Sequence, residues 1–315
     1  MDVTETVARN SAEAFLAEIR RSAPQWLDAT HGPECGWVFR GQPNATLPLV
    51  PSAFRSVRNS LLDLLREDIV RKCGSRDWRS QLKVLAPELT CSDADLAATA
   101  IDALTHAGAV RLFMAVADEV RRPIVFSELL HHVFNETRDE FSQYFAGRYS
   151  GPEQIFAVAQ HHGVPTQFLD WTLDPLIAAY FAAAKADPAS SEPMAVWALR
   201  RDLFDCEWSL CRFTVRAGVT PFLDAQAGLF TWNRRAYIEC ANRGSYVPFE
   251  QVVEEASGAP PLAALTPPLI RKVTLPAAEA VELLKLLWRE RVTPAHLMPT
   301  FDHVTMAVQQ RVRWL

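Results

Sequence analysis

Thirteen residues near the middle of the chain, QHHGVPTQFLDWT at 160–172, combine several groups able to take part in binding or catalysis. Gly163 and Pro165 disfavour both a regular helix and a regular strand, so the backbone here must adopt a special shape. Such a segment is typical of a loop that holds polar side chains against a ligand. The groups it offers are two imidazoles, two hydroxyls and a carboxylate, from His161, His162, Thr166, Thr172 and Asp170.

The directions of these side chains follow from the local backbone. An extended chain after Pro165 places Asp170 and Thr172 on one face, because side chains alternate along a strand. Neighbouring helical residues point in different directions, so His161 and His162 do not share a metal ion, and we predict no metal site. Asp170 is either a ligand-binding carboxylate or a turn residue that accepts backbone N–H groups. Trp171 is either a core residue or a wall for ligand stacking.

A second candidate group precedes this stretch. The run WVFRGQ at 37–42 predicts a short strand that closes with Gly41, and it places Arg40 at the edge of a sheet. There a guanidinium can fork onto a phosphate or a carboxylate. The alternative is a buried ion pair that serves only the fold. The sequence alone does not separate these two roles.

The segments around these groups predict a mixture of helices and strands. From about 59 to 149 the periodicity is helical throughout. DPLIAAYFAAAKA predicts a helix capped by Asp174, with Pro175 in its first position. Later segments predict strands at MAVWALR, RFTVRA, RRAYIECA and LIRKVTLP, and a helix at AAEAVELLKLLWRERV. We therefore predict a single α+β domain over 1–315, with a mixed central sheet and 59–149 as a helical insertion or side layer.

Composition and motif content exclude several classes of protein. A formal charge of −5 over 315 residues gives no bulk-charge signal for nucleic acid. No run of eighteen apolar residues and no signal peptide is present, so we expect a cytoplasmic protein that does not enter a membrane. The six cysteines form no C-x-x-C pair and are expected to be reduced. No P-loop, dinucleotide fingerprint, zincin or nucleophile-elbow motif occurs.

Four motifs in order resemble the FRG domain family, which is named for its Phe/Tyr-Arg-Gly motif. They are WVFRGQ at 37–42, LPLVPSAFR at 47–55, AVAQHHGVPTQFLDWTLDPLIAAYFAA at 157–183 and AQAGLF at 225–230. VELLKLLWRERVTPAHLMPTFD is similar to the family's usual ending, so the resemblance spans roughly residues 30 to 305. Two features depart from the family pattern: His162 replaces an aromatic residue, and Gln167-Phe168 replaces Arg-Leu.

The FRG pattern also resembles the ADP-ribosyltransferase folds, and this resemblance implies NAD as a substrate. Those enzymes stabilise an oxocarbenium-like state by holding the pyrophosphate and ribose rather than by a strong base. They normally place a Glu where this chain has Gln226, and Glu239 is the fallback for that position. The implied catalytic residues are Arg40, His161, Thr172 and Gln226. The implied cofactor-binding residues are Arg40, Gly41, Gln42, Thr166, Asp170 and Trp171.

Two functions follow as expectations. The first is an NAD-using ADP-ribosyltransferase-like enzyme that acts as a toxin or a bacterial defence effector, on an acceptor macromolecule that the sequence does not name. The second is a non-catalytic domain that recognises a nucleotide-like small molecule or a partner through the same cleft. The Gln at 226 favours the second function. Both require Arg40, Thr172 and Gln226 to meet in one cleft.

Overall fold

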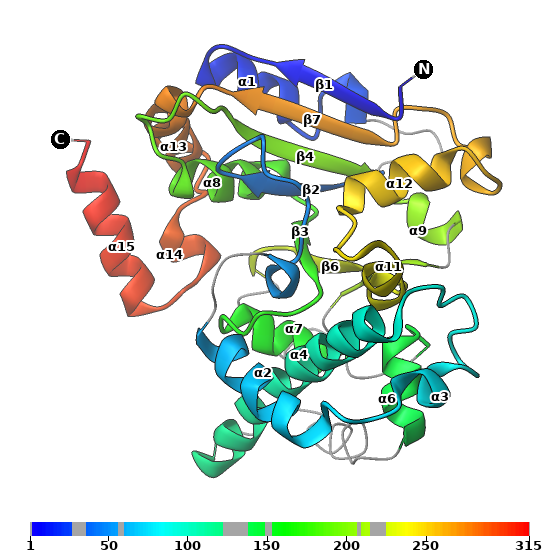
Figure 1. Cartoon of the computed structure of the whole chain (residues 1–315). Helices are drawn as coiled ribbons and strands as arrows, with labels where there is room; N and C mark the ends of the chain where they lie inside the picture. The colour runs from blue at the N-terminus through cyan, green and yellow to red at the C-terminus, as the bar shows by residue number, and fades with distance from the viewer. Residues whose placement is uncertain are drawn as a thin grey trace.

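The computed structural model describes residues 2–26, 36–55, 60–121, 138–148, 153–206, 209–214 and 225–314. These residues form a mixed α/β fold around a seven-stranded sheet, ordered β1-β7-β4-β2-β3-β6-β5 (Figure 1). The first pair is parallel and the others are antiparallel, which confirms the predicted mixed sheet. The strands are β1 (Thr4–Ala8), β2 (Trp37–Gln42), β3 (Leu169–Thr172), β4 (Met194–Arg200), β5 (Leu210–Phe213), β6 (Gly228–Asn233) and β7 (Ile270–Leu275).

The sheet has a weak boundary between β2 and β3, which we call the seam. β2 pairs with β4 from Trp37 to Gln42, and β3 pairs with β6 along its whole length. Across the seam, in contrast, Phe39 and Thr172 make the single register pair. The two halves of the sheet therefore diverge immediately beyond this pair.

Helices cover the two halves of the sheet separately. α1 (Ala12–Ile19), α8 (Pro175–Lys185) and α13 (Ala280–Arg289) pack on the β2 half, around Phe39 and Val273. The helical block packs on the β3 half, around Phe168 and Phe230 (Figure 1). Its elements are α2 (Ser60–Cys73), α3 (Trp78–Leu82), α4 (Asp93–Glu119), α6 (Arg138–Phe145), α7 (Glu153–His161) and α11 (Ala236–Arg243).

These two helical layers share one face of the sheet. Phe39 pairs with Thr172, and Asp170 pairs with Phe230, while Asp170 and Thr172 lie two residues apart on β3. Paired residues and residues two apart point to the same side. The other face carries a third cluster that includes Trp171 and Trp197, covered by α12 (Phe249–Ser257). The remaining helices are α9 (Leu203–Cys206), α14 (Pro294–Leu297) and α15 (Phe301–Val312), with short 3₁₀ turns at Pro24–Trp26, Ser52–Phe54, Leu262–Ala264 and Ala277–Glu279.

Local sequence explains most of these elements. The Asp174 carboxylate accepts the N–H of Leu176 at 2.8 Å and Pro175 starts α8, as the sequence predicts. The strands predicted at WVFRGQ, MAVWALR and LIRKVTLP are confirmed, as is the helix of α13. α4 is long and apolar enough to cross a membrane by length and composition, but 50% of its most apolar window is buried inside the fold.

Two features differ from the sequence prediction. RRAYIECA was predicted to be a strand, but most of it lies in α11, where Tyr237 and Ala241 are buried one helical turn apart. Gly244 ends this helix in the left-handed region at φ 76°, where a glycine is tolerated without strain. β1 was not predicted, because its edge strand has no fully buried residue and leaves no apolar pattern. The prediction at RFTVRA holds as far as Phe213; residues 215–217 lie outside the described residues.

Candidate functional site

A pocket of about 750 Å³ opens at the seam, a volume typical of small-molecule sites. Its lining includes the adjacent residues Phe39 and Arg40, which point to opposite faces of β2, so the pocket reaches both sides of the sheet. Of the predicted site residues, it brings together Arg40, Gly41, Gln42, His161, Asp170, Trp171, Thr172 and Gln226. The expected meeting of Arg40, Thr172 and Gln226 in one cleft is therefore observed.

The seam opens because the β2–β3 ladder stops after one pair. The Arg201 N–H donates to the Gly36 carbonyl at 2.8 Å. In an antiparallel ladder this means that the backbone N–H and C=O groups of even-numbered β2 residues point toward β4, whereas those of Gly41 point toward β3. A continued ladder would pair Gly41 with Asp170. Instead, the Asp170 carbonyl accepts a hydrogen bond from Arg40 Nη1 at 2.6 Å. Gly41 consequently has no register partner on β3 among the described residues, and its N–H and C=O are directed into the seam.

Arg40 is almost enclosed, with a side chain that is 13% exposed. Its Nη1 also lies 3.6 Å from the Asp170 carboxylate, whereas Nε is buried without a hydrogen-bond partner among the described residues. Nη2 makes no hydrogen bond to a described residue and is not fully buried, and Arg40 is one of the residues that line the pocket. Burial lowers the pKa of Arg40, with the nearby Arg55 adding to the lowering and Asp170 opposing it. Arg40 thus serves the fold and also lines the pocket.

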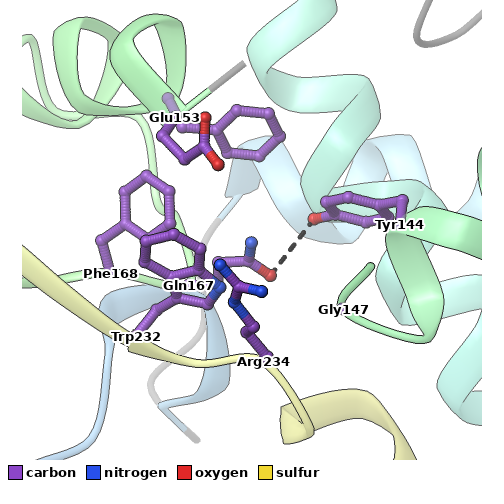
Figure 2. Close-up of a pocket in the computed structure, with 8 residues that line it drawn as sticks. Tyr144, Gly147, Glu153, Gln167, Phe168, Trp232 and Arg234 are labelled. Atoms are coloured by element: carbon purple, nitrogen blue, oxygen red, sulfur yellow. Dashed lines mark hydrogen bonds between the residues drawn. The ribbon is translucent and has the colours of Figure 1, made fainter. Parts of the chain in front are cut away.

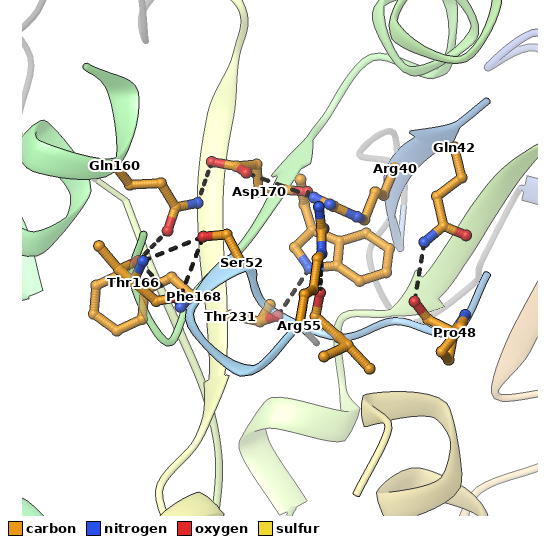
Figure 3. A network of polar contacts seen from close by, with 12 residues as sticks. Arg40, Gln42, Pro48, Ser52, Arg55, Gln160, Thr166, Phe168, Asp170 and Thr231 are labelled. Atoms are coloured by element: carbon orange, nitrogen blue, oxygen red, sulfur yellow. Dashed lines mark hydrogen bonds and ion pairs between the residues drawn. The ribbon is translucent and has the colours of Figure 1, made fainter. Parts of the chain in front are cut away.

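Asp170 is open to solvent, with a side chain that is 59% exposed. Its carboxylate accepts a hydrogen bond from Gln160 Nε2 at 2.6 Å (Figure 3). The carboxylate accepts no hydrogen bond from a backbone N–H of any described residue, so the structure does not show Asp170 acting as a turn residue. Among the described residues of the lining, Asp170 is the one carboxylate.

Two cations of the lining were missed by sequence analysis. They are Arg55, in the loop after β2, and Lys185, in the last turn of α8. Arg55 lies within LPLVPSAFR, one of the stretches that carries the family resemblance, and that position was the available signal. The described lining therefore holds Arg40, Arg55 and Lys185 against Asp170, in a chain of net charge −5.

His161 lies at the end of α7 and borders the same pocket. Its pKa is lowered, first by burial and then by the neighbouring His162, so the neutral imidazole is favoured. The two rings are 5.3 Å apart and nearly perpendicular, at 83°. No group of three or more metal-ligating side chains occurs among the described residues, so nothing there points to a metal ion.

Three predicted residues use their polar groups to hold the fold. Gln42 accepts from Trp197 Nε1 at 2.7 Å and donates to the Pro48 carbonyl at 3.3 Å. Trp171 is 3% exposed and donates to Thr231 Oγ1 at 2.8 Å, so it is chiefly a core residue. Thr172 donates to the Gln226 carbonyl at 2.7 Å and accepts the Asp174 N–H at 3.0 Å.

Thr166 differs from the other predicted residues because it does not border the pocket. It is fully buried, and its hydroxyl is hydrogen-bonded to Gln160 Oε1. Its N–H donates to Ser52 Oγ at 3.2 Å, and its carbonyl accepts the Ala53 N–H at 3.1 Å (Figure 3). Thr166 therefore anchors the loop that carries Arg55 rather than meeting a ligand in the pocket.

Gln226 lies two residues before β6 and directs its side chain toward the C-terminal segment. Its Nε2 donates to the Leu297 carbonyl at 3.4 Å. The strand prediction was wrong for the fallback residue Glu239, which lies on α11 and does not line the pocket. There it accepts from Asn233 Nδ2 at 2.7 Å, and burial raises the pKa of its carboxyl.

Comparison with protein families matches the FRG domain to residues 115–191. This chain carries an FRG domain. The match contains α7, β3 and α8, and thus His161, Asp170 and Thr172. It is shorter than the resemblance inferred over residues 30 to 305, and Arg40 and Gln226 lie outside it. No curated protein and no solved structure matches the chain.

The FRG domain match also includes part of a much smaller cavity, of about 20 Å³ (Figure 2). It is bordered by Gln167, Phe168, Trp232 and Arg234, and Tyr144 donates to Gln167 Oε1 at 3.4 Å. Such a volume accommodates about one water molecule. The seam pocket is therefore the candidate ligand site associated with this FRG domain.

Proposed function

We propose that the seam pocket binds a phosphate-bearing nucleotide, with NAD as the first ligand to test. The observation that carries the proposal is that the pocket lining joins Arg40, whose Nη2 makes no hydrogen bond to a described residue, to Gly41, which has no register partner on β3. A guanidinium suits a phosphate oxygen, and a backbone N–H with a neighbouring C=O suits a carboxamide. Nicotinamide dinucleotides contain both groups.

The finer form of this proposal is an NAD-using ADP-ribosyltransferase-like enzyme that acts as a toxin or defence effector. It is supported by the order of Arg40, Thr172 and Gln226 along the chain and by their meeting around one pocket. Arg40 and Gly41 would hold NAD, while Thr172 fixes the backbone of Gln226. Cleavage of the nicotinamide–ribose bond would then rest on orientation and on the Asp170 carboxylate near the developing cation.

A second candidate function, nucleotide recognition without catalysis, is favoured by Gln226. The amide carries no charge, and its nitrogen is engaged with the Leu297 carbonyl. No glutamate borders the pocket among the described residues. An uncharged group stabilises an oxocarbenium-like state less than a carboxylate does.

Calorimetric titration with NAD tests the binding step. A ligand that binds only the folded protein raises the free energy of unfolding by about 2.7 kcal/mol at a hundredfold excess over Kd, and therefore raises the melting temperature. We expect Arg40→Lys to abolish binding, since a point charge does not reproduce the guanidinium fork. Arg66→Lys is the matched control, because Arg66 pairs with Asp102 in the helical block. Absence of NAD binding at millimolar concentration would end this proposal.

Nicotinamide release separates the two functions. Gln226→Ala is expected to reduce the NAD-dependent rise in melting temperature, and Gln226→Glu to preserve or raise nicotinamide release. The transferase form requires measurable release from the native protein with water or an added acceptor. NAD binding without release in both the native protein and Gln226→Glu supports recognition instead.

A further inference from the structure

The described part of the loop after β2, residues 43–55, is held in place by contacts with other parts of the fold. The Leu49 N–H donates to the Glu250 carboxylate at 3.0 Å, and the Leu49 carbonyl accepts the Phe249 N–H at 3.0 Å. Ser52 and Ala53 are joined to Thr166. Because α12 and the segment around Thr166 both hold this loop, the position of Arg55 is set before any ligand arrives.

Arg55 is held by its inner nitrogen, and its outer nitrogens make no hydrogen bond to a described residue. Its Nε donates to the Val50 carbonyl at 3.0 Å, and it forms no ion pair with a described residue (Figure 3). Its side chain borders the seam pocket close enough to Arg40 to lower the pKa of that guanidinium. The fold therefore keeps two cations together, with the Asp170 carboxylate beside one of them.

This arrangement costs free energy in the empty pocket, because like charges repel and burial opposes the charged form. An anion placed between the two guanidiniums removes the repulsion. A single phosphate meets Arg40, while a second phosphate extends toward Arg55. Two arginines on a rigid frame match the two groups of a diphosphate.

We propose that Arg55 is a second phosphate-binding residue and that the pocket selects nucleotides carrying a diphosphate over nucleoside monophosphates. The inference rests on the proposed nucleotide binding and assigns its phosphate subsites. Arg40 holds the phosphate nearer the seam, and Arg55 holds the phosphate nearer the loop.

An aromatic and apolar wall adjoins Arg55. The rings of Phe54 and Tyr246 stack at 4.4 Å and both border the pocket. Leu47, Pro48 and Val50 continue the wall, and Leu47 is 49% exposed despite its apolar side chain. A planar base joined to the diphosphate would cover this surface, which favours a nucleotide over inorganic pyrophosphate.

The test compares adenosine, AMP, ADP and NAD by calorimetry on the native protein, Arg55→Gln and Arg55→Lys. We expect ADP and NAD to bind about tenfold more tightly than AMP, the effect of one added charge-assisted hydrogen bond. Arg55→Gln should remove this preference while AMP affinity stays within about threefold, and Arg55→Lys should restore part of it. Arg71→Gln, at a side chain that is 76% exposed on α2, is the control.

Other outcomes separate this inference from the proposed function. Equal affinities for AMP and ADP in the native protein, or an equal loss of both in Arg55→Gln, would overturn the diphosphate assignment while leaving nucleotide binding intact. Inorganic pyrophosphate is titrated in parallel. Binding of pyrophosphate through Arg55 without any NAD binding would refute the proposed function and leave only the assignment of Arg55 as a phosphate-binding residue, whereas binding of neither would refute both.

Discussion

At the residue scale, Arg40 has two roles that the sequence could not separate. Nη1 donates to the Asp170 carbonyl in place of a backbone N–H, and the residue also lines the pocket. Arg40→Lys should therefore lower the free energy of unfolding by about 1 kcal/mol, the worth of one hydrogen bond. Chemical denaturation measures this loss. A folded Arg40→Lys that binds NAD as tightly as the native protein would exclude Arg40 as a phosphate ligand.

His106 provides a pH test inside the helical block. It is 5% exposed, its Nδ1 lies 3.1 Å from the Tyr237 hydroxyl, and burial lowers its pKa from 6.5 to about 4. Because the folded protein binds this proton more weakly than the unfolded chain, the stability it contributes is complete above pH 6.5. It is lost as the pH falls toward 4, by about 3 kcal/mol.

Urea denaturation at pH 7 and pH 4.5 checks this dependence. His106→Gln keeps a polar side chain opposite Tyr237 and removes the titrating group. The variant should lose less stability on acidification than the native protein does. An identical loss in both proteins would show that other groups govern the acid sensitivity.

At the element scale, the close packing of α8 on β2 requires a glycine at position 41, because there is no room for a Cβ there. A Cβ on Gly41 would lie 1.9 Å from the Ala178 carbonyl oxygen and 2.7 Å from the Ala182 nitrogen. These are backbone atoms, so helix and strand would have to separate. We expect Gly41→Ala to lower the free energy of unfolding by about 3 kcal/mol or more.

Gly258→Ala is the matched control for this change. Its Cβ would meet nothing within 4 Å, and its φ of −76° suits any residue. We expect a change within about 0.5 kcal/mol. Thermal denaturation of the two variants gives the comparison, and a mild Gly41→Ala would mean that α8 shifts easily relative to the sheet.

At the scale of the whole molecule, the pocket lies where core packing is interrupted. Three buried clusters fill the fold: one under α8, one in the helical block and one under α12. The clusters under α8 and in the helical block lie on the same face of the sheet, and the boundary between them falls at the seam, where backbone pairing also stops. The seam is thus the part of the sheet with the least to hold it closed.

Hydrogen exchange tests this view of the molecule. Without ligand, a peptide covering 37–42 should exchange faster than one covering 194–200, because the Gly41 amide lacks a ladder partner and β4 is paired on both sides. Saturating NAD should slow exchange in the peptide covering 37–42 and leave the other unchanged. Protection confined to residues outside the pocket lining would place the ligand elsewhere.

Much of the local structure could be predicted from the sequence. WVFRGQ and MAVWALR are β-branched and aromatic runs that form strands in most contexts, and Asp174-Pro175 is a helix start by its own chemistry. α11 could not be predicted in the same way. Tyr237 and Ile238 favour a strand by propensity, and only burial against the other helices of the helical block, α4 above all, selects the helix.

The sequence by itself determined the residue types that could meet a nucleotide, the FRG resemblance and the elements that carry Arg40, Asp170 and Thr172. Only the tertiary structure decided which of them remain available. Gln42, Trp171 and Thr166 satisfy buried partners, whereas Arg55 is left without an ion pair to any described residue. The physical reason is that a side chain's availability depends on whether distant segments supply its hydrogen-bond partners, and the seam exists only once two half-sheets come together.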